Sequence, residues 1–361
     1  MKILSTANQI KDFLGIEPLQ TITIRVTKGC NLKCIQCYSV SGTKLKNELL
    51  LEEIKNIIDQ GKKLGVIRIF LTGGEPLIRP DIDEILKYAD DNELAIYMST
   101  NGTLFNKKIV NTLKNLKHLR TLQISIDGLK ETHDSIRGAK GTFDRTITWA
   151  KYIKKEFRNT DKKIAFILTL MEKNKNEVVK VYELAISLGI DVFAIVPLYP
   201  VKRLKDAKDI SVKEKYKIFQ NLCGIYKSRK PKTKIGLLVP PALIPEPLKE
   251  IEYGSGYVCT FPNMLGINAN GDIAPCDGLL SYKKFILGNT RKDSLRKMWD
   301  CPLMKKLRGI EEHDLKGVCK KCKYLSFCMG GCRARAFIKY GNFKSQNPLC
   351  QSFRSENLFL E

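Results

Sequence analysis

The sequence lacks the features that would place the chain in or across a membrane. Its longest apolar run, residues 164–171, is much shorter than the roughly 20 apolar residues that a membrane-spanning helix needs. The first 20 residues contain neither the apolar core nor the small-residue cleavage site of a secretory signal peptide. We therefore expect a cytoplasmic protein that does not contact a membrane.

Histidines and aromatic side chains are also few, and there is no internal repeat or low-complexity segment. The three histidines lie among charged or polar neighbours, so none is predicted to have a catalytic or metal-binding role. The lysine-rich segments 202–217 and 227–234 contain few of the aromatic side chains on which bases stack, which argues against nucleic acid binding despite a net charge of +24. This charge suits an acidic peptide or an anionic small molecule as partner.

Cysteine, in contrast, is abundant, with twelve residues in the chain. Disulfides are disfavoured in a reducing compartment, so clustered cysteines indicate metal or redox chemistry. One group lies near the start of the chain and a larger group follows residue 258. Cys223 and Cys301 fit neither group and are predicted to be ordinary buried thiols.

Short strand-like segments alternate with amphipathic ones between residues 19 and 200. Strands are predicted at 21–27, 66–72, 94–100, 120–127, 163–170 and 191–197, and helices at 50–64, 81–90, 107–116, 143–155 and 176–188. The alternation predicts an α/β fold with a parallel sheet, either open or rolled into a partial barrel. We expect a short N-terminal extension (1–18) before it, then a connecting region (201–257) and a small cysteine-rich domain (258–361).

The unusual local sequences all follow predicted strands. They are residues 30–37, 73–76, 99–102, 125–128 and 197–200. Ligands of parallel β/α folds bind at the carboxyl ends of the strands, so these segments predict one site on one rim of the sheet.

Cys30, Cys34 and Cys37 form the pattern C-x3-C-x2-C directly after the first strand. Three thiolates on a four-iron cluster leave one iron open, and an open metal position allows a cosubstrate to bind and be activated. A structural zinc site would normally need a fourth ligand, and no histidine lies nearby. A partly used zinc site or plain buried thiols are the alternatives.

This pattern resembles the signature of the radical S-adenosylmethionine (SAM) superfamily, and the other rim segments resemble its motifs in order. The resemblance implies a partial (β/α)6 TIM-like barrel in which the three cysteines hold a [4Fe-4S] cluster that binds SAM. The sequence Gly73-Gly74-Glu75-Pro76 resembles the GGEP turn, whose backbone and glutamate meet the SAM amino group. The implied contacts to the ribose and the SAM carboxylate are Ser99, Asn101, Ser125, Asp127 and Arg137.

One position departs from the family pattern. Many members have an aromatic residue just before the third cysteine, where Gln36 stands in this chain, and Tyr38 follows that cysteine instead. We therefore expect the adenine contacts to come from Tyr38 and Val196.

The second cysteine group combines C-x11-G-x4-C, a four-cysteine run and one later cysteine. The run alone could hold zinc, but seven cysteines fit two iron–sulfur clusters better. The full pattern resembles the SPASM extension of peptide-maturing radical SAM enzymes, which makes 258–361 a small cysteine-rich iron–sulfur domain. The resemblance implies an inner auxiliary cluster on Cys259, Cys276 and Cys332, and an outer one on Cys319, Cys322, Cys328 and Cys350.

Two details of this domain concern the inner cluster. Some relatives supply a fourth inner ligand from a preceding cysteine, but residues 252–256 contain none, so one iron is open or bound from elsewhere. Asp277 matches the position of a proposed proton acceptor in the anaerobic sulfatase-maturating enzymes. A simple turn residue is the alternative for Asp277.

The implied activity is that of a radical SAM oxidoreductase or maturase with SAM and three [4Fe-4S] clusters. SAM would be cleaved reductively to a 5′-deoxyadenosyl radical, which removes a hydrogen atom from a substrate. The electron donor would be a flavodoxin or a ferredoxin. A non-catalytic iron–sulfur electron-transfer protein is the alternative of another class, but it would need neither the GGEP-like turn nor Arg137.

The resemblance favours a peptide or protein side chain as substrate, oxidised or cross-linked to itself. Such a peptide would need a separate recognition protein or direct contact with the barrel. The alternative is decarboxylation or trimming of an anionic small molecule, such as a haem-precursor tetrapyrrole. Haem-biosynthesis enzymes share this architecture and a similar sequence around Cys332–Ala336.

Overall fold

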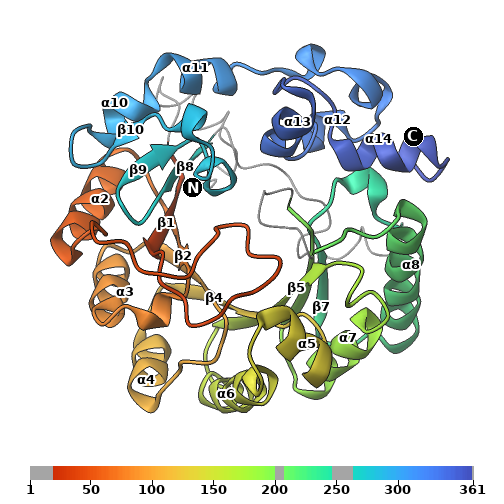
Figure 1. The fold of residues 1–361 in the computed structure, drawn as a ribbon, viewed down its shortest axis with the longest axis horizontal. Helices are drawn as coiled ribbons and strands as arrows, with labels where there is room; N and C mark the ends of the chain where they lie inside the picture. Colours follow the sequence, from red (N-terminus) through yellow and green to blue (C-terminus); the bar gives the residue numbers. More distant parts are fainter. Residues whose placement is uncertain (1–18, 200–206, 246–262, 360–361) are drawn as a thin grey trace, which may run out of the picture.

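The protein is built around one ten-stranded sheet. The computed structural model describes residues 19–199, 207–245 and 263–359. The strands lie in the order β10-β9-β8-β1-β2-β3-β4-β5-β6-β7. Helices from the first two thirds of the chain surround the curved sheet, and the C-terminal segment lies across its open side (Figure 1).

The barrel half of the sheet contains seven parallel strands. They are β1 (Thr21–Thr27), β2 (Arg68–Gly73), β3 (Ala95–Thr100), β4 (Leu119–Ser125), β5 (Lys163–Leu170), β6 (Val192–Pro197) and β7 (Lys234–Leu237). The helices between them are α2 (Leu51–Lys63), α3 (Ile82–Asp91), α4 (Lys107–Asn115), α5 (Lys130–Arg137), α6 (Thr142–Glu156), α7 (Val178–Ser187) and α8 (Val212–Arg229). The partial TIM-like barrel expected from the sequence is confirmed.

One part of the barrel lies where the sequence predicted only a connecting region. Helix α8 and strand β7 extend the β/α alternation there, and β7 pairs in parallel with β6. The strand is only four residues long, and α8 places a charged residue, Lys215, on its buried side. Both features weaken the periodicity on which the prediction depended.

The two faces of the strands differ in burial. On β2, Ile69 and Leu71 are buried, whereas the alternate residues Phe70 and Thr72 are partly exposed. Strand β3 shows the same alternation. The buried face packs under the helices, as the close approach of Ile22 to α2 shows. The opposite face lines the inside of the barrel and is accessible from its rim.

The C-terminal segment continues the same sheet. Strand β8 (Met264–Ile267) pairs in parallel with β1, and β9 (Asp272–Ala274) and β10 (Gly288–Asn289) follow in antiparallel order. Five α-helices come after the strands: α10 (Leu295–Trp299), α11 (Pro302–Arg308), α12 (Leu325–Cys328), α13 (Arg333–Tyr340) and α14 (Pro348–Ser355).

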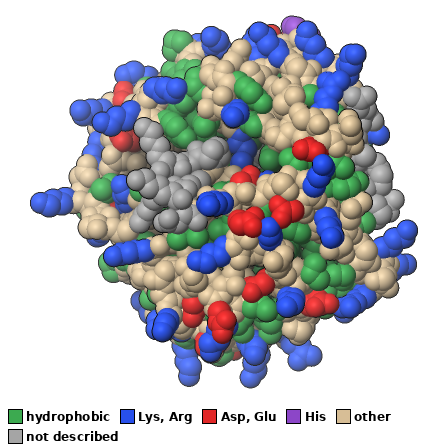
Figure 2. Space-filling model, turned by 45° about the vertical axis from the view of Figure 1, so that its right-hand side comes forward, with side chains coloured by type: hydrophobic (Ala, Val, Ile, Leu, Met, Phe, Trp, Pro, Cys, Tyr) green, Lys and Arg blue, Asp and Glu red, His purple; other side chains and the backbone are tan. Residues whose placement is uncertain are grey.

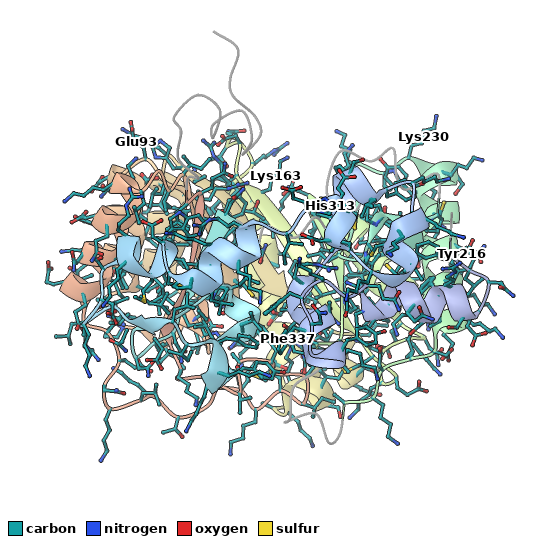
Figure 3. All side chains as sticks on the ribbon, turned by 90° about the horizontal axis from the view of Figure 1, so that it is seen from above. Glu93, Lys163, Tyr216, Lys230, His313 and Phe337 are labelled. Carbon is teal, nitrogen blue, oxygen red and sulfur yellow. The ribbon has the colours of Figure 1, made fainter. Side chains whose placement is uncertain are left out.

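This segment contacts both edges of the barrel. At one edge β8 pairs with β1. At the other edge α14 packs on α8, where the ring of Tyr216, labelled in Figure 3, meets the ring of Phe353 edge-on with the ring centroids 6.4 Å apart. An ion pair between Lys213 and Glu356, 3.0 Å long, joins α8 to the residue that follows α14. Among the described residues, no helix is both long and apolar enough to cross a membrane.

Candidate functional site: a cysteine loop, a glycine turn and an auxiliary domain

The first three cysteines lie in the loop that leaves β1 at the rim of the barrel. The amide of Cys30 donates to the Gly42 carbonyl over 2.8 Å, and the amide of Ile35 donates to the Ile136 carbonyl over 3.0 Å. All three thiols are free and partly exposed. Burial raises the pKa of the Cys30 thiol to about 11 and also raises the pKa of Cys34. Thiols of this kind ionise readily only beside a metal or another cation.

The backbone of the glycine turn after β2 is hydrogen-bonded to the end of β1 and to this loop. The amide of Gly74 donates to the Thr27 carbonyl over 2.8 Å, and the amide of Glu75 donates to the Gly29 carbonyl over 2.9 Å. Gly73 has a φ of +138°, which L side chains rarely adopt, and a Cβ on Gly74 would lie 2.0 Å from the Gly29 carbonyl oxygen. Only glycine therefore permits this approach of two backbones. The next residue, Pro76, is buried at the start of the short 3-10 helix η1 (Pro76–Ile78).

The Glu75 carboxylate has a different environment from the one expected. It is fully buried and accepts from the Thr100 hydroxyl over 2.7 Å and from the Asn101 amide over 2.6 Å. A third bond of 3.1 Å comes from the Leu77 amide. Burial raises the pKa of Glu75. Because it accepts from donors at the ends of both strands, this carboxylate joins the ends of β2 and β3.

A second buried carboxylate, Asp127, organises the far side of the rim. Arg137 from the end of α5 pairs with Asp127 over 2.5 Å, and its other terminal nitrogen lies 3.7 Å from the Cys34 sulfur. The Gln36 amide nitrogen donates to the same Asp127 oxygen. Burial raises the pKa of Asp127, whereas the carboxylate of Asp127 and the thiol of Cys34 outweigh burial and raise the pKa of Arg137. This network ties the cysteine loop to the end of β4.

Two polar atoms of this network are buried without a partner, the Nε of Arg137 and the Oε1 of Gln36. Buried donors and acceptors are costly when unpaired, so they favour a ligand that supplies both an acceptor and a donor. SAM carries such groups. Together with three free thiols on one loop, these atoms indicate that the rim fits an iron–sulfur cluster with bound SAM.

The remaining residues expected at the SAM site lie at the ends of neighbouring strands. The Ser99 hydroxyl donates to Gln123 over 2.7 Å, and the Asn101 side-chain amide donates to Asn31 of the cysteine loop over 2.9 Å. Ser125 and Val196 are partly exposed at the ends of β4 and β6. The structure thus places all of these residues on the same rim as the cysteine loop.

Tyr38 belongs to a separate group that joins the barrel to the C-terminal segment. The Arg25 Nε donates to the Asp277 carboxylate over 2.6 Å, and the Arg25 guanidinium lies 5.4 Å from the centre of the Tyr38 ring. The Tyr38 ring also lies 6.2 Å from that of Tyr199. Burial and the nearby charge of Asp277 raise the pKa of Tyr38. The candidate base Asp277 is therefore held in an ion pair, with 15% of its side chain exposed.

A hollow of about 220 Å³ opens beside this group, between the cysteine loop and the C-terminal segment. Its walls come from the end of β1, from the cysteine loop and from the residues after β8 and Asp277: Arg25, Thr27, Lys28, Ser39, Val40, Ser41, Asn268, Leu280 and Ser281. Its position next to Cys37 and Asp277 makes it the candidate entrance for a substrate.

The four cysteines expected at the outer cluster surround one cavity. Cys319, Cys322, Cys328 and Cys350 line it together with apolar side chains such as Val318, Leu325 and Phe359. Burial raises the pKa of Cys328 to about 11, with the neighbouring thiols Cys319 and Cys322 acting in the same direction. Burial and the neighbouring thiols also raise the pKa of Cys350. Residues that are up to 31 positions apart in sequence thus converge on one apolar space.

Cys276 and Cys332 form a third group beside the Tyr199 ring. Burial and the Cys332 thiol raise the pKa of Cys276, and both thiols contribute to the raised pKa of Tyr199. Cys259, the third expected inner ligand, lies outside the described residues. Cys223 is buried on α8 and Cys301 precedes α11, and the structure brings neither into these groups. Among the described residues, no three His, Cys, Asp or Glu side chains form a site for a single metal ion.

Several residues of the site were not singled out from the sequence. Arg25 carries a visible signal, because an arginine within an otherwise apolar and threonine-rich strand needs a buried partner. Gln36 was noticed only as a departure from the family pattern. Asn31 and His133, whose Nδ1 accepts from the Asp127 amide over 3.1 Å, carry no local signal because their roles depend on the surrounding fold.

A cysteine loop, a glycine turn and a buried Arg–Asp pair meet at the rim of the barrel. This arrangement suits an enzyme that binds a cluster and a cosubstrate together. Family comparisons identify the class: residues 24–185 match the radical SAM superfamily and residues 259–323 match SPASM, an iron-sulfur cluster-binding domain. The chain belongs to the radical SAM superfamily and carries a C-terminal SPASM domain.

Individual relatives extend these matches over nearly the whole chain. The chain is 31% identical to the AdoMet-dependent heme synthase of Methanosarcina barkeri over 344 residues, which cover 91% of this chain and 95% of that protein. It is 28% identical to the Bacillus subtilis antilisterial bacteriocin subtilosin biosynthesis protein AlbA over 93% of this chain and 71% of AlbA. The structure of Streptococcus suis SuiB bound to S-adenosylmethionine has the same fold, with a TM-score of 0.76 at 23% identity over 97% of this chain and 84% of SuiB.

Proposed function

We propose that the chain binds one SAM and three [4Fe-4S] clusters. Cys30, Cys34 and Cys37 would hold the SAM-binding cluster. The outer auxiliary cluster would fill the cavity lined by its four cysteines, and Cys276 and Cys332 would hold the inner cluster together with Cys259. Support for this assignment comes from the grouping of the described cysteines in space, because the described members of each set lie together at a separate place in the fold.

When bound, the first cluster and SAM supply a one-electron reduction that yields a radical able to remove a hydrogen atom from a substrate. The chain's own part is to bind, orient and shield. The unpaired Arg137 Nε suits the SAM carboxylate, because a guanidinium beside Asp127 is fixed in direction. Gln36 Oε1 offers an acceptor to a hydroxyl or amino group of SAM. Asp277 would act on the substrate at the wall of the hollow, either as proton acceptor or by holding Arg25.

For the substrate, we infer an anionic tetrapyrrole whose carboxylate side chains are trimmed. One observation carries this choice: the identity to a heme synthase extends over almost the full length of both chains. A further relative is an Fe-coproporphyrin III synthase, 27% identical over 92% of this chain. Oxidative trimming of one propionate releases carbon dioxide and leaves a vinyl group; the radical derived from SAM would take one hydrogen atom, and an auxiliary cluster would be suited to accept the remaining electron.

The arginines of the Cys332–Ala336 stretch are not available to a substrate carboxylate. Arg335 donates to the carbonyls of Pro197 and Leu198, at 2.8 and 2.9 Å, and Arg333 donates to carbonyls within the C-terminal segment. Both arginines are therefore engaged with backbone. Lys28 lines the hollow, is only partly exposed and has no ion-pair partner in the part of the chain that the structure describes. We propose Lys28 as the residue that meets a substrate carboxylate.

Modification of a peptide side chain is the second candidate. It is favoured by the identity of 28% to AlbA and to the mycofactocin maturase MftC of Mycolicibacterium smegmatis, each over 93% of this chain. A peptide would also fit the cationic character of the chain, whose net charge is +24.

The test begins with anaerobic reconstitution and a count of iron and sulfide, for which we expect about twelve irons per chain. The loaded protein is then reduced with dithionite and given SAM with Fe-coproporphyrin III, or with a peptide encoded next to this gene. Formation of 5′-deoxyadenosine together with tetrapyrrole products lighter by carbon dioxide and two hydrogens per side chain supports the first candidate. Loss of two hydrogens from the peptide, with the tetrapyrrole unchanged, supports the second.

A further inference from the structure

Three lysines surround the cysteines expected at the outer cluster. Lys320, Lys321 and Lys323, here called the lysine collar, alternate with Cys319 and Cys322 on the 3-10 helix η7 (Gly317–Lys321) and the residues after it. All three lysines are exposed, and none has a salt bridge within the described residues. Of the acidic residues just before them, Asp314 pairs with Lys344 and Glu311 lies 3.4 Å from His313, and the exposed Glu312 forms no ion pair with the three lysines within the described residues. The collar therefore keeps its full positive charge.

An apolar side chain completes this surface. Phe327, on α12 between Cys322 and Cys328, is 57% exposed and is one of the few large apolar residues of the described chain that faces solvent. Helix α12 lies beside α13 and α14 in the C-terminal segment (Figure 1), and Lys and Arg side chains are spread around the outline of the molecule, its upper edge included (Figure 2). Aromatic side chains are enriched in protein interfaces, so Phe327 can add an apolar contact beside the three cations.

The surface lies directly over the cysteine cavity. Cys322 is partly exposed, whereas Cys319, Cys328 and Cys350 are each 5–6% exposed. Tyr324 and Leu325, which line the cavity, belong to the same short stretch as Lys323 and Phe327. A cluster held there would therefore lie close to the collar, with one of its ligands, Cys322, partly exposed.

We propose that the lysine collar and Phe327 form the docking site for an acidic one-electron carrier protein, a flavodoxin or ferredoxin by class, which exchanges electrons with the outer cluster. This proposal rests on the proposed function, because it requires the cluster. The step is balanced without protons or bond changes, since the reduced carrier loses one electron and the cluster gains it. Opposite charges raise the rate of encounter, and contacts between redox partners are commonly small and weak.

The alternative is that the three lysines have a purely structural role, which predicts a different effect of their removal. Thiolate-ligated clusters carry negative charge, and the lysines could simply offset it. In that case, their removal would change the reduction potential of the outer cluster or the iron content, but not the dependence of the reduction rate on carrier concentration and salt. Docking instead predicts that the dependence of the reduction rate on carrier concentration and salt changes, whereas the reduction potential and the iron content do not.

The experiment compares the loaded enzyme with the triple charge-reversal variant K320E/K321E/K323E in stopped-flow reduction by flavodoxin hydroquinone. A matched control, K151E/K155E/R158E, makes the same change in net charge on exposed residues at the far end of α6. We expect the second-order rate of the collar variant to fall about tenfold or more at low salt and to lose most of its salt dependence, with the control close to wild type. Reduction by dithionite, iron content and dithionite-driven SAM cleavage should match wild type in both variants.

Two further variants keep the test decisive. The neutral variant K320Q/K321Q/K323Q should show a smaller loss of rate in the same direction, and Phe327→Ser should weaken flavodoxin binding without changing the salt dependence. Equal rates for the collar variant and the control overturn the proposal. So does a collar variant in which only the potential of the outer cluster shifts. An iron content near eight that Cys350→Ala does not lower further, with intact dithionite-driven SAM cleavage, would remove the outer cluster from the proposed function and, with it, the docking site.

Discussion

Arg25 and Asp277 form an ion pair that joins strand β1 to the C-terminal segment, 252 positions away in sequence. The Arg25 side chain is 5% exposed, so its charge depends on Asp277 and on the ring of Tyr38. A buried ion pair loses far more when one partner is removed than when both are replaced. The role of Asp277 as a proton acceptor and its role as an anchor therefore predict different results for paired substitutions.

We predict that Asp277→Asn lowers substrate turnover at least about a hundredfold and leaves SAM cleavage intact, because Arg25 loses its counter-ion at the wall of the hollow. Turnover and 5′-deoxyadenosine formation are measured in the same assay. Unchanged turnover would contradict any role for this carboxylate. In the double variant R25M/D277N, partial recovery indicates an anchor, and no recovery indicates that the carboxylate itself accepts a proton.

At the scale of single elements, the turn after β2 positions the cysteine loop through its backbone. A Cβ at Gly74 would lie 2.0 Å from the carbonyl oxygen of Gly29 and 2.9 Å from that of Lys28. Neither atom can move without moving the residue before Cys30.

We therefore predict that Gly74→Ala destabilises the protein by about 1–3 kcal/mol and reduces loading of the first cluster. Gly42→Ala is the matched control. The Gly42 carbonyl accepts from the Cys30 amide, but an added Cβ at Gly42 would meet no atom within 4 Å, so its substitution should be tolerated. The measurements are the unfolding midpoint and the iron content of both variants. Equal values for Gly74→Ala and Gly42→Ala would show that the turn does not hold the loop.

Helix α5 is one of the elements that the sequence prediction omitted, although it carries Arg137 and His133 one turn apart. His133 is 1% exposed, its Nδ1 accepts from the Asp127 amide, and its Nε2 has no partner in the described structure. Burial, with the nearby charge of Arg137, lowers the pKa of His133 to about 3. The imidazole is therefore neutral in the folded protein and becomes protonated far more easily when the chain unfolds.

The expected consequence is a loss of stability on acidification. Above pH ~6.5 neither state binds a proton at His133, whereas between pH ~6.5 and the folded pKa only the unfolded state does, so stability falls by up to about 1.4 kcal/mol per pH unit. We predict that His133→Leu is less stable at neutral pH, because the Asp127 amide loses its acceptor, but shows a smaller drop in unfolding midpoint between pH 7.5 and 5.5. A drop as large as that of wild type would assign the acid sensitivity to other groups.

The hydrophobic periodicity of the sequence predicted most strands and helices of the barrel, because the strands are long and buried on at least one face. Strands β1 and β5 have the residue ranges predicted from the sequence. Strand β7 and helix α5 were missed because one is four residues long and the other has eight residues with a charged sequence, KETHDSIR. Elements of this size depend on tertiary contacts, which no local window contains.

Part of the candidate site could likewise be predicted from the sequence, and part could not. Cysteine spacing and rim motifs pointed to residues that the structure brings together on the rim and in the SPASM domain. The environment of Glu75 and the pairing of Gln36 with Asp127 could not be read from the sequence, because their partners lie 25 to 91 positions away and depend on the curvature of the sheet. The environment of Tyr38 was missed for the same reason.

For the whole molecule, the three groups of cysteines lie at separate places and should load separately. We predict that Cys350→Ala lowers the iron content by about four per chain and leaves dithionite-driven SAM cleavage intact, whereas Cys34→Ala also lowers it by about four but abolishes that cleavage. Cys223→Ala, at a thiol outside the groups, should lose no iron. Loss of all iron from Cys350→Ala would show that the sites do not form independently.

The pairing of β1 with β8 has a consequence for how the chain is made. Strand β1 leaves the ribosome early, but the residue that pairs with Ile24 is Ile267, more than two hundred residues later. At about 5–20 residues per second, synthesis of the intervening chain takes on the order of ten seconds or more. During that time the nascent barrel presents one uncovered strand edge to every other chain nearby. Translation speed and chaperones, as well as iron supply, would then determine how much of this protein reaches its native state.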